Sequence, residues 1–125
     1  MSNREINDAY EVLERNYKCM ENSMSYDLHE KWIFSETHFW EFYDSVIALA
    51  KETQARGADT QTAMEITFVY QHFLKEIIYH FDKQDESCLK HFPKNYLAYI
   101  ERLDGALDAY FRGVFMDEEL YSLKR

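Results

Sequence analysis

The chain has 125 residues, the size of one domain, and contains only three glycines and one proline. So few turn formers disfavour a turn-rich sheet protein and favour long helices with short connections. The formal net charge of −9, from 23 acidic and 14 basic side chains, argues against direct nucleic-acid binding, because phosphates are usually met by a basic surface.

The first predicted elements are helical. Ser2 and Glu5 have the spacing of a capping box, which opens a helix over residues 3–22. Charged pairs at i,i+4 spacing occupy one side of this helix. The other side is apolar and is predicted to be buried, and it consists of Ile6, Ala9, Leu13, Tyr17 and Met20. The pattern then breaks, and residues 26–34 form either a short helix or a packed connection.

A second long helix is predicted over residues 36–56. Ser35 precedes it as an N-cap and Gly57 follows it as a stop signal. Asp59 or Thr60 then caps a third helix, so the connection between these two helices is short. Large apolar side chains at helical spacing give the second helix one buried face.

The third helix is the predicted centre of the domain. Its stretch from Glu65 to Phe81 reads EITFVYQHFLKEIIYHF, and ten of these seventeen residues are large and apolar or aromatic. They cover most of the helix circumference, which is typical of a helix packed on several sides. A single strand of this length is uncommon, so we predict a central apolar helix.

The last long helix is predicted to start with Pro93 in its first turn and to end at Gly113. Asp117 can cap a short final turn that runs through Tyr121. The sequence therefore predicts an all-α fold, in which residues 1–125 form a single domain. It has four main helices plus short helical segments, arranged around the central apolar helix, which is the third of the four.

Cellular location is inferred from the same chain. The N-terminal stretch MSNREIND is polar and charged, unlike a signal peptide, and no apolar run approaches the roughly 18 residues of a membrane span. Cys19 and Cys88 are isolated in the sequence, which suits reduced thiols. We expect a cytoplasmic protein that does not associate with membranes.

One set of residues resembles a metal site. His72, Glu76 and His80 stand four residues apart along one side of the third helix, and His38 with Glu41 could complete a mixed site. However, the Glu-x-x-His pairs of di-iron bundles are absent. Such histidines usually lie at the edge of an aromatic core, so we expect no cofactor. A helical bundle that binds a metal or small ligand through the first three residues is the alternative function.

Catalytic signatures are also absent. The chain has no glycine-rich phosphate loop, no Gly-x-Ser-x-Gly sequence, and no cysteine in a recognised nucleophile signature. Carboxylate pairs are numerous, but a chain with 23 acids contains such pairs by chance. We therefore expect a protein that is not an enzyme.

A first candidate binding surface lies in residues 21–44, which contain six acids, one base and seven aromatic residues. Glu36, Trp40 and Asp44 are spaced at i, i+4 and i+8, which places the Trp between two acids at the edge of the buried face. Exposed Trp residues are favoured at protein interfaces. The competing interpretation is that Trp40 belongs to the periphery of the core.

A second candidate surface lies on the last helix, where Glu101, Asp104 and Asp108 surround Gly105. Like charges at these spacings cost a few tenths of a kcal/mol each, and a glycine inside a helix costs about 1 kcal/mol. Folding alone does not call for this combination, so we predict a second partner-binding surface. In the competing interpretation this face is solvated and partly neutralised, with Arg112 paired to Asp108.

In size, charge and aromatic content the chain resembles the immunity proteins of bacterial toxin–immunity systems, especially those of contact-dependent growth inhibition. The resemblance is to the character of the whole chain and involves no shared motif. It implies a cytoplasmic protein that binds the toxin domain of a cell-surface effector, often a nuclease, and covers its active site. The expected partner is therefore a basic protein toxin domain.

Overall fold

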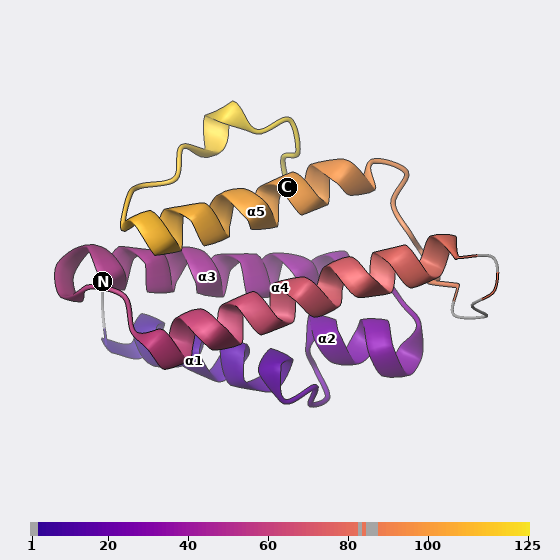
Figure 1. Ribbon diagram of the computed structural model, residues 1–125, viewed down its shortest axis with the longest axis horizontal. Coiled ribbons are helices and arrows are strands. Elements are labelled where there is room, and N and C mark those ends of the chain that lie inside the picture. The colour runs from indigo at the N-terminus through magenta and orange to yellow at the C-terminus, as the bar shows by residue number, and fades with distance from the viewer. Residues whose placement is uncertain (1–2, 83, 85–87) are drawn as a thin grey trace.

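The computed structural model describes residues 3–82, 84 and 88–125, and this part of the chain is predominantly helical (Figure 1). Ser2, the predicted cap of the first helix, lies outside these residues. The helical elements are α1 (Asn3–Tyr17), α2 (Met24–Tyr26), the π-helical turn η1 (Asp27–Lys31), α3 (Glu36–Arg56), α4 (Thr60–Phe81), α5 (Tyr96–Arg112) and the 3₁₀ turn η2 (Glu118–Leu120). The described residues form no strand, and the predicted all-α fold is confirmed.

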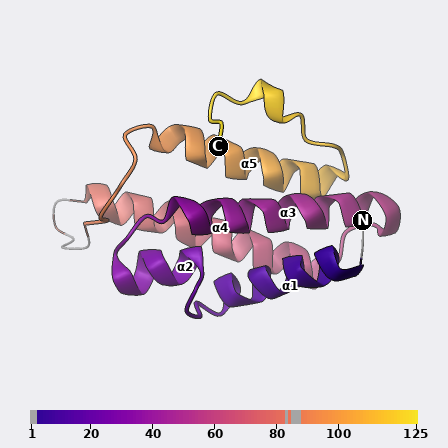
Figure 2. The same ribbon diagram turned by 180° about the vertical axis from the view of Figure 1, so that it is seen from behind.

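The four long helices form a bundle. Helix α1 packs against α3 and α4, and α5 packs against the same two helices from the other side (Figures 1 and 2). Helices α3 and α4, although consecutive in sequence, therefore face each other diagonally across the core. Helices α1 and α5 occupy the other diagonal. Within the described residues, no helix is long and apolar enough to cross a bilayer.

Helix α3, rather than α4, is the most deeply buried helix. Phe39, Phe42, Tyr43 and Val46 are each 0% exposed. Both α1 and α5 cover this helix, and the segment after α5 covers it further through Met116 and Glu118, which the Tyr43 hydroxyl contacts. The contacts of α3 with α1 and α5 are the most extensive between any two helices, so side chains around more of its circumference are buried.

Helix α4 has one buried stripe, so the prediction that it is packed on several sides is wrong. Ile66, Val69, Phe73 and Ile77 are buried, at the spacing of a single helix face. Other large side chains of the helix are exposed, namely Phe68 (39%), Ile78 (62%), Tyr79 (41%) and Phe81 (53%). A position in a four-helix bundle offers α4 one inward face, and the remaining apolar side chains lie on the surface.

The predicted caps of the later helices are confirmed. The side chains of Ser35, Asp59 and Asp117 each accept a hydrogen bond from a backbone N–H at the start of α3, α4 and η2. Gly57 ends α3 and Gly113 ends α5, both with positive φ, at +80° and +63°. These backbone angles favour glycine because a Cβ atom would be strained there.

Helix α1 is shorter than predicted because it ends at Tyr17 and not at residue 22. Cys19 has a left-handed φ of 53°, which turns the chain. The buried Asn16 side chain accepts a hydrogen bond from the backbone N–H of Ser25 at 3.1 Å, and so holds the returning chain against the helix end. Met20, predicted on the buried side, is 48% exposed.

The predicted start of the last long helix at Pro93 is wrong, since α5 begins at Tyr96. Just before this proline, the Phe92 ring stacks on His80 at 4.0 Å and meets Phe34 edge-on at 6.2 Å. A turn at residues 94–95 follows the proline, and the Tyr96 ring then packs against Phe92 at 5.4 Å. The helix can begin only after that turn.

The structure predicts that alkali destabilises the fold. Partial burial, reinforced by the Asp104 carboxylate, raises the pKa of Tyr70 to about 12. An unfolded tyrosine has a pKa of about 10, so the unfolded chain releases this proton first. The stabilisation that protonated Tyr70 contributes to the folded state is therefore complete below pH 10 and is lost as the pH approaches about 12. In urea unfolding between pH 7 and about 11, Tyr70→Phe should make the free energy of unfolding less dependent on pH. Tyr79→Phe, on the exposed side of α4, should leave this dependence unchanged. Equal pH dependence in both variants would contradict the expectation.

Candidate functional site

The first candidate surface, predicted from Glu36, Trp40 and Asp44, contains a Trp that belongs to the core. Trp40 is only 8% exposed, and its ring meets Phe39 and Tyr43 edge-on at 5.1 and 5.2 Å. The guanidinium groups of Arg102 and Arg125 lie 5.4 and 4.7 Å from its ring centroid. These contacts leave little of the indole for a partner.

The two acids beside Trp40 also have contacts inside the chain. Asp44 accepts two hydrogen bonds from Arg125, at 2.6 and 2.7 Å, in the bidentate geometry that suits a guanidinium group. Glu36 is exposed and lies beside the Tyr99 hydroxyl. Burial raises the pKa of Tyr99, and the Glu36 carboxylate raises it further. The charge of this surface is thus partly neutralised by the segment after α5.

Arg102, which the sequence analysis did not single out, anchors that segment. It is 3% exposed, and its guanidinium donates two hydrogen bonds to the backbone carbonyl of Leu123. It also donates to the Tyr43 hydroxyl at 2.9 Å and to the Glu118 carboxylate at 3.2 Å. Its position between inward-facing residues of α5 was the available signal, since an arginine on a buried helix face needs partners.

The second candidate surface is exposed and borders a groove. Glu101, Asp104 and Asp108 lie along α5 and line a groove of ≈ 730 Å³ between this helix and the segment around Tyr121. A Cβ atom at Gly105 would lie 1.9 Å from the Tyr121 hydroxyl oxygen. The glycine therefore has a packing function, which the sequence did not indicate, whereas the three acids are not explained by packing.

These three carboxylates differ in their contacts. Asp108 pairs with Arg112 at 2.8 Å, as the i,i+4 spacing predicted. Asp104 lies 3.4 Å from the Tyr70 hydroxyl, and Glu101 forms no ion pair with a described residue. Two of the three acids are thus without a cationic partner in the described part of the chain.

Exposed apolar side chains continue this surface. Phe111 (53% exposed) and Leu120 (81% exposed) line the groove together with the three acids. Phe111 also lines a second groove of ≈ 390 Å³, between α5 and the first half of α4, where Met64 (42%) and Phe68 (39%) are exposed. An acidic strip and an apolar strip therefore meet at Phe111. We call this combined region the α5 surface.

The residues of the predicted alternative metal site do not come together. His80 accepts a hydrogen bond from the backbone N–H of Leu89 at 2.9 Å. Glu76 is bonded to His29 at 3.1 Å, and His72 is exposed. Among residues 3–82, 84 and 88–125, no group of three His, Cys, Asp or Glu side chains is placed to hold a metal ion.

The two additional candidate ligands have other partners. His38 donates from Nδ1 to the buried carboxylate of Asp27 at 2.5 Å. Glu41 accepts from Arg15 at 3.2 Å. Both contacts connect α3 to elements that precede it in the chain. A mixed site with the α4 histidines would require these pairs to break.

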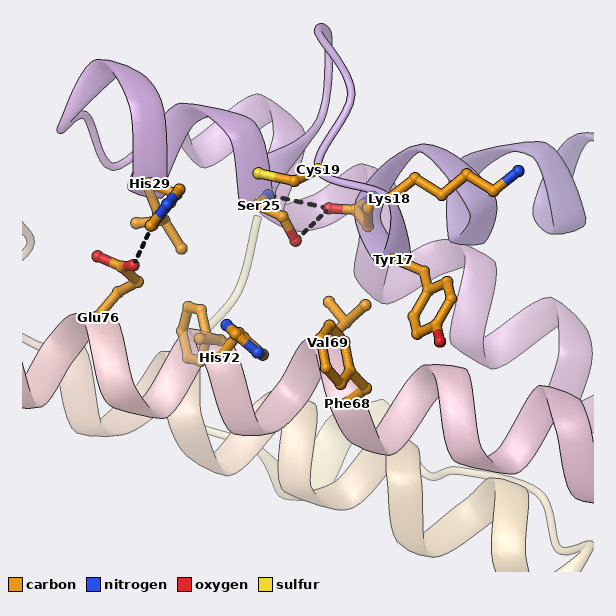
Figure 3. A pocket seen from close by; sticks show the side chains of 12 residues that line it. Tyr17, Lys18, Cys19, Ser25, His29, Phe68, Val69, His72 and Glu76 are labelled. Carbon is orange, nitrogen blue, oxygen red and sulfur yellow. Dashed lines mark hydrogen bonds and ion pairs between the residues drawn. The ribbon is translucent and has the colours of Figure 1, made fainter.

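A pocket of ≈ 200 Å³ lies between α4, the end of α1 and the α2–η1 segment (Figure 3). We call it the Glu76 pocket, because the carboxylate of this buried residue lies at one end of it and is bonded to His29. Figure 3 shows that His72 and Phe68 rise from α4 into the same space, while Cys19 borders it from the turn after α1. His29 and Cys19 were not predicted to belong to a site, since nothing in their spacing indicates that they line one pocket with Glu76.

Comparison with known proteins gives no assignment. No protein-family model, no curated protein and no solved structure matches this chain. The described part of the chain offers two candidate sites, the α5 surface and the Glu76 pocket. Both contain side chains whose exposure or burial is not explained by the packing of the fold.

Proposed function

We propose that this chain is an immunity-type inhibitor, which binds a basic toxin domain through the α5 surface. The observation that supports this most directly is the groove in which Glu101, Asp104 and Asp108 stand beside exposed Phe111 and Leu120. Interfaces combine a few apolar or aromatic anchors with a polar rim. The α5 surface has that composition.

The net charge of −9 indicates the chemistry of the partner. An acidic surface attracts a basic one and raises its association rate, and acidic charges repel other acidic proteins. Nucleases carry basic surfaces because they bind phosphates. A nuclease toxin domain of a contact-dependent growth inhibition system therefore suits the α5 surface, and binding over its active site would neutralise it in the cytoplasm.

The first candidate surface is a weaker choice for this interface. Trp40 is 8% exposed and Asp44 is occupied by Arg125, so a partner would need to displace contacts within the chain. Displacement would cost the two bidentate hydrogen bonds before any gain from binding. On the α5 surface, Glu101 and the exposed Leu120 are available without such a rearrangement.

The test uses the toxin domain, which we expect at the C-terminus of an exported protein encoded next to this chain. We expect the triple variant Glu101→Lys, Asp104→Lys and Asp108→Lys to lower the association rate constant about tenfold or more, because these charges steer the encounter. Phe111→Ala should mainly raise the dissociation rate, since anchors hold the formed complex. Stopped-flow association and survival of cells that express the toxin are the measurements.

The matched control reverses three exposed acids near α1, which lies diagonally across the bundle from α5: Asp8→Lys, Glu11→Lys and Glu21→Lys. It changes the net charge by the same amount, so it should retain protection and most of the association rate. Equal loss in both triple variants would mean that net charge alone matters. Unchanged binding in the α5 variant, or no binding of the toxin domain by the unmodified protein, would refute the proposal.

A further inference from the structure

The Glu76 pocket contains a carboxylate in a largely apolar setting. Glu76 is 8% exposed, and one of its oxygens accepts a hydrogen bond from Nδ1 of His29 at 3.1 Å (Figure 3). The other oxygen forms no hydrogen bond to a described residue. A buried carboxylate is costly unless it is fully paired, so this oxygen has capacity for a further donor.

Apart from His29, no basic side chain that lines the pocket pairs with this carboxylate. Lys18 lines the pocket, but its ammonium is bonded to Glu14 at 2.7 Å and points away along α1 (Figure 3). Burial raises the pKa of the Cys19 thiol, and the carboxylates of Glu30 and Glu76 raise it further. The thiol therefore stays protonated, which does not suit a nucleophile. The two carboxylates also create a negative potential in this part of the molecule.

The walls of the pocket are aromatic and aliphatic. Phe68 meets Tyr17 edge-on at 5.0 Å and lies 4.3 Å from the His72 ring, both between ring centroids. Val69 and Phe73 close the side formed by α4. Aromatic faces attract organic cations, and apolar walls take up an apolar stem. A volume of ≈ 200 Å³ suits a molecule of a few carbon atoms or one ring.

From the enclosed carboxylate, its second oxygen without a described partner and the aromatic walls, we propose that the Glu76 pocket binds a small organic cation. The ligand would be a protonated amine or amidine on a short apolar stem. Its N–H groups would donate to the free oxygen of Glu76, and its stem would lie against Phe68 and Val69. Among the described residues this binding site shares only Phe68 with the α5 surface, and it does not depend on the proposed inhibitor function.

The test uses three molecules of nearly the same shape and different charge. Benzamidine is a cation at neutral pH, benzamide is neutral and benzoate is an anion. In isothermal titration calorimetry with the full chain, benzamidine should bind with a dissociation constant of about 1 mM or below, which is reasonable for a fragment of this size. Benzamide should bind about tenfold more weakly, because its neutral N–H groups form weaker hydrogen bonds to the carboxylate, and benzoate should not bind, because its charge is repelled.

Variants assign the binding to the pocket. Glu76→Gln keeps the shape of the side chain and should weaken benzamidine binding about tenfold or more. Glu65→Gln on the same helix removes the same charge outside the pocket, and should leave binding unchanged. His72→Trp, at an exposed position on the pocket wall, fills the space and should also abolish binding even if Glu76→Gln does not fold.

Several outcomes would overturn the proposal. One is the absence of benzamidine binding up to about 20 mM, where even a weak fragment site fills. If benzamide or benzoate bound as tightly as benzamidine, the pocket would select its ligand by shape and not by charge. Binding that survives both Glu76→Gln and His72→Trp would place the ligand elsewhere.

Discussion

Replacing Arg102 by alanine is expected to lower the free energy of unfolding by about 3 kcal/mol. The arginine is 3% exposed and donates hydrogen bonds to Leu123, Tyr43 and Glu118. Its loss would leave the buried Leu123 carbonyl without its donor, which costs about 1–3 kcal/mol. It would also remove a guanidinium group that packs between aromatic rings, including Tyr121 at 5.1 Å from its centroid. Urea denaturation followed by circular dichroism measures this change.

The control is Arg112→Ala on the same helix. Arg112 forms an exposed i,i+4 pair with Asp108, with 70% of its side-chain surface accessible. Such pairs contribute about 0.5 kcal/mol or less, so the variant should unfold almost like the unmodified protein. If Arg102→Ala lies within about 1 kcal/mol of this control, the buried arginine does not anchor the segment as the contacts indicate.

The stability of this segment also matters for the proposed interface. Residues 120–122 form one wall of the groove on the α5 surface, and Tyr121 lies directly against the backbone at Gly105. Arg102 therefore connects the core of α3 to the wall that presents Leu120. A variant that loosens this wall should weaken partner binding even though the three acids remain in place.

Sequence patterns located most helices because the signals are local. Ser35, Asp59 and Gly113 act within one turn of their own position, through hydrogen bonds or backbone angles that do not depend on residues far away in the sequence. Where a distant residue decides the end, the prediction was wrong. Helix α1 ends early because the Asn16 side chain binds the backbone of Ser25, after the chain has reversed.

The apolar content of α4 gave an incorrect picture of its burial. Periodicity shows which residues share a face, but it does not show how many neighbours a helix has. Ile78 and Phe81 are apolar and yet 62% and 53% exposed. The bundle order, in which α3 and α4 face each other diagonally, is set by contacts between segments far apart in sequence. No local pattern in the chain indicates that order.

The candidate sites were predictable only in part. The acids of the α5 surface follow from helical spacing, and the structure places all three along one groove. The partners that decide the other sites are distant in sequence: Arg125 reaches Asp44 across 81 positions, and His29 reaches Glu76 across 47. Such pairs are created by the tertiary fold, so single-sequence reasoning could not find them.

Replacing Trp40 by alanine is expected to destabilise the fold by about 3–5 kcal/mol, the range for large core aromatic residues. The indole is 8% exposed, meets the rings of Phe39 and Tyr43, and lies beneath Arg125. A surface anchor would behave differently, because its removal would weaken partner binding and leave the melting temperature nearly unchanged. Thermal and urea unfolding of the isolated protein therefore distinguish a core residue from an anchor.

Trp40→Phe is the informative companion variant. The indole Nε1 is buried and has no hydrogen-bond partner among the described residues, which costs free energy in the folded state. Phenylalanine keeps an aromatic ring and removes this unpaired N–H group, so the gain partly offsets the lost volume and the net cost should stay below about 1.5 kcal/mol. An equal loss of stability in the alanine and phenylalanine variants would mean that the indole N–H has a partner. An alanine variant as stable as the unmodified protein would instead support the interpretation of Trp40 as a partner-binding residue.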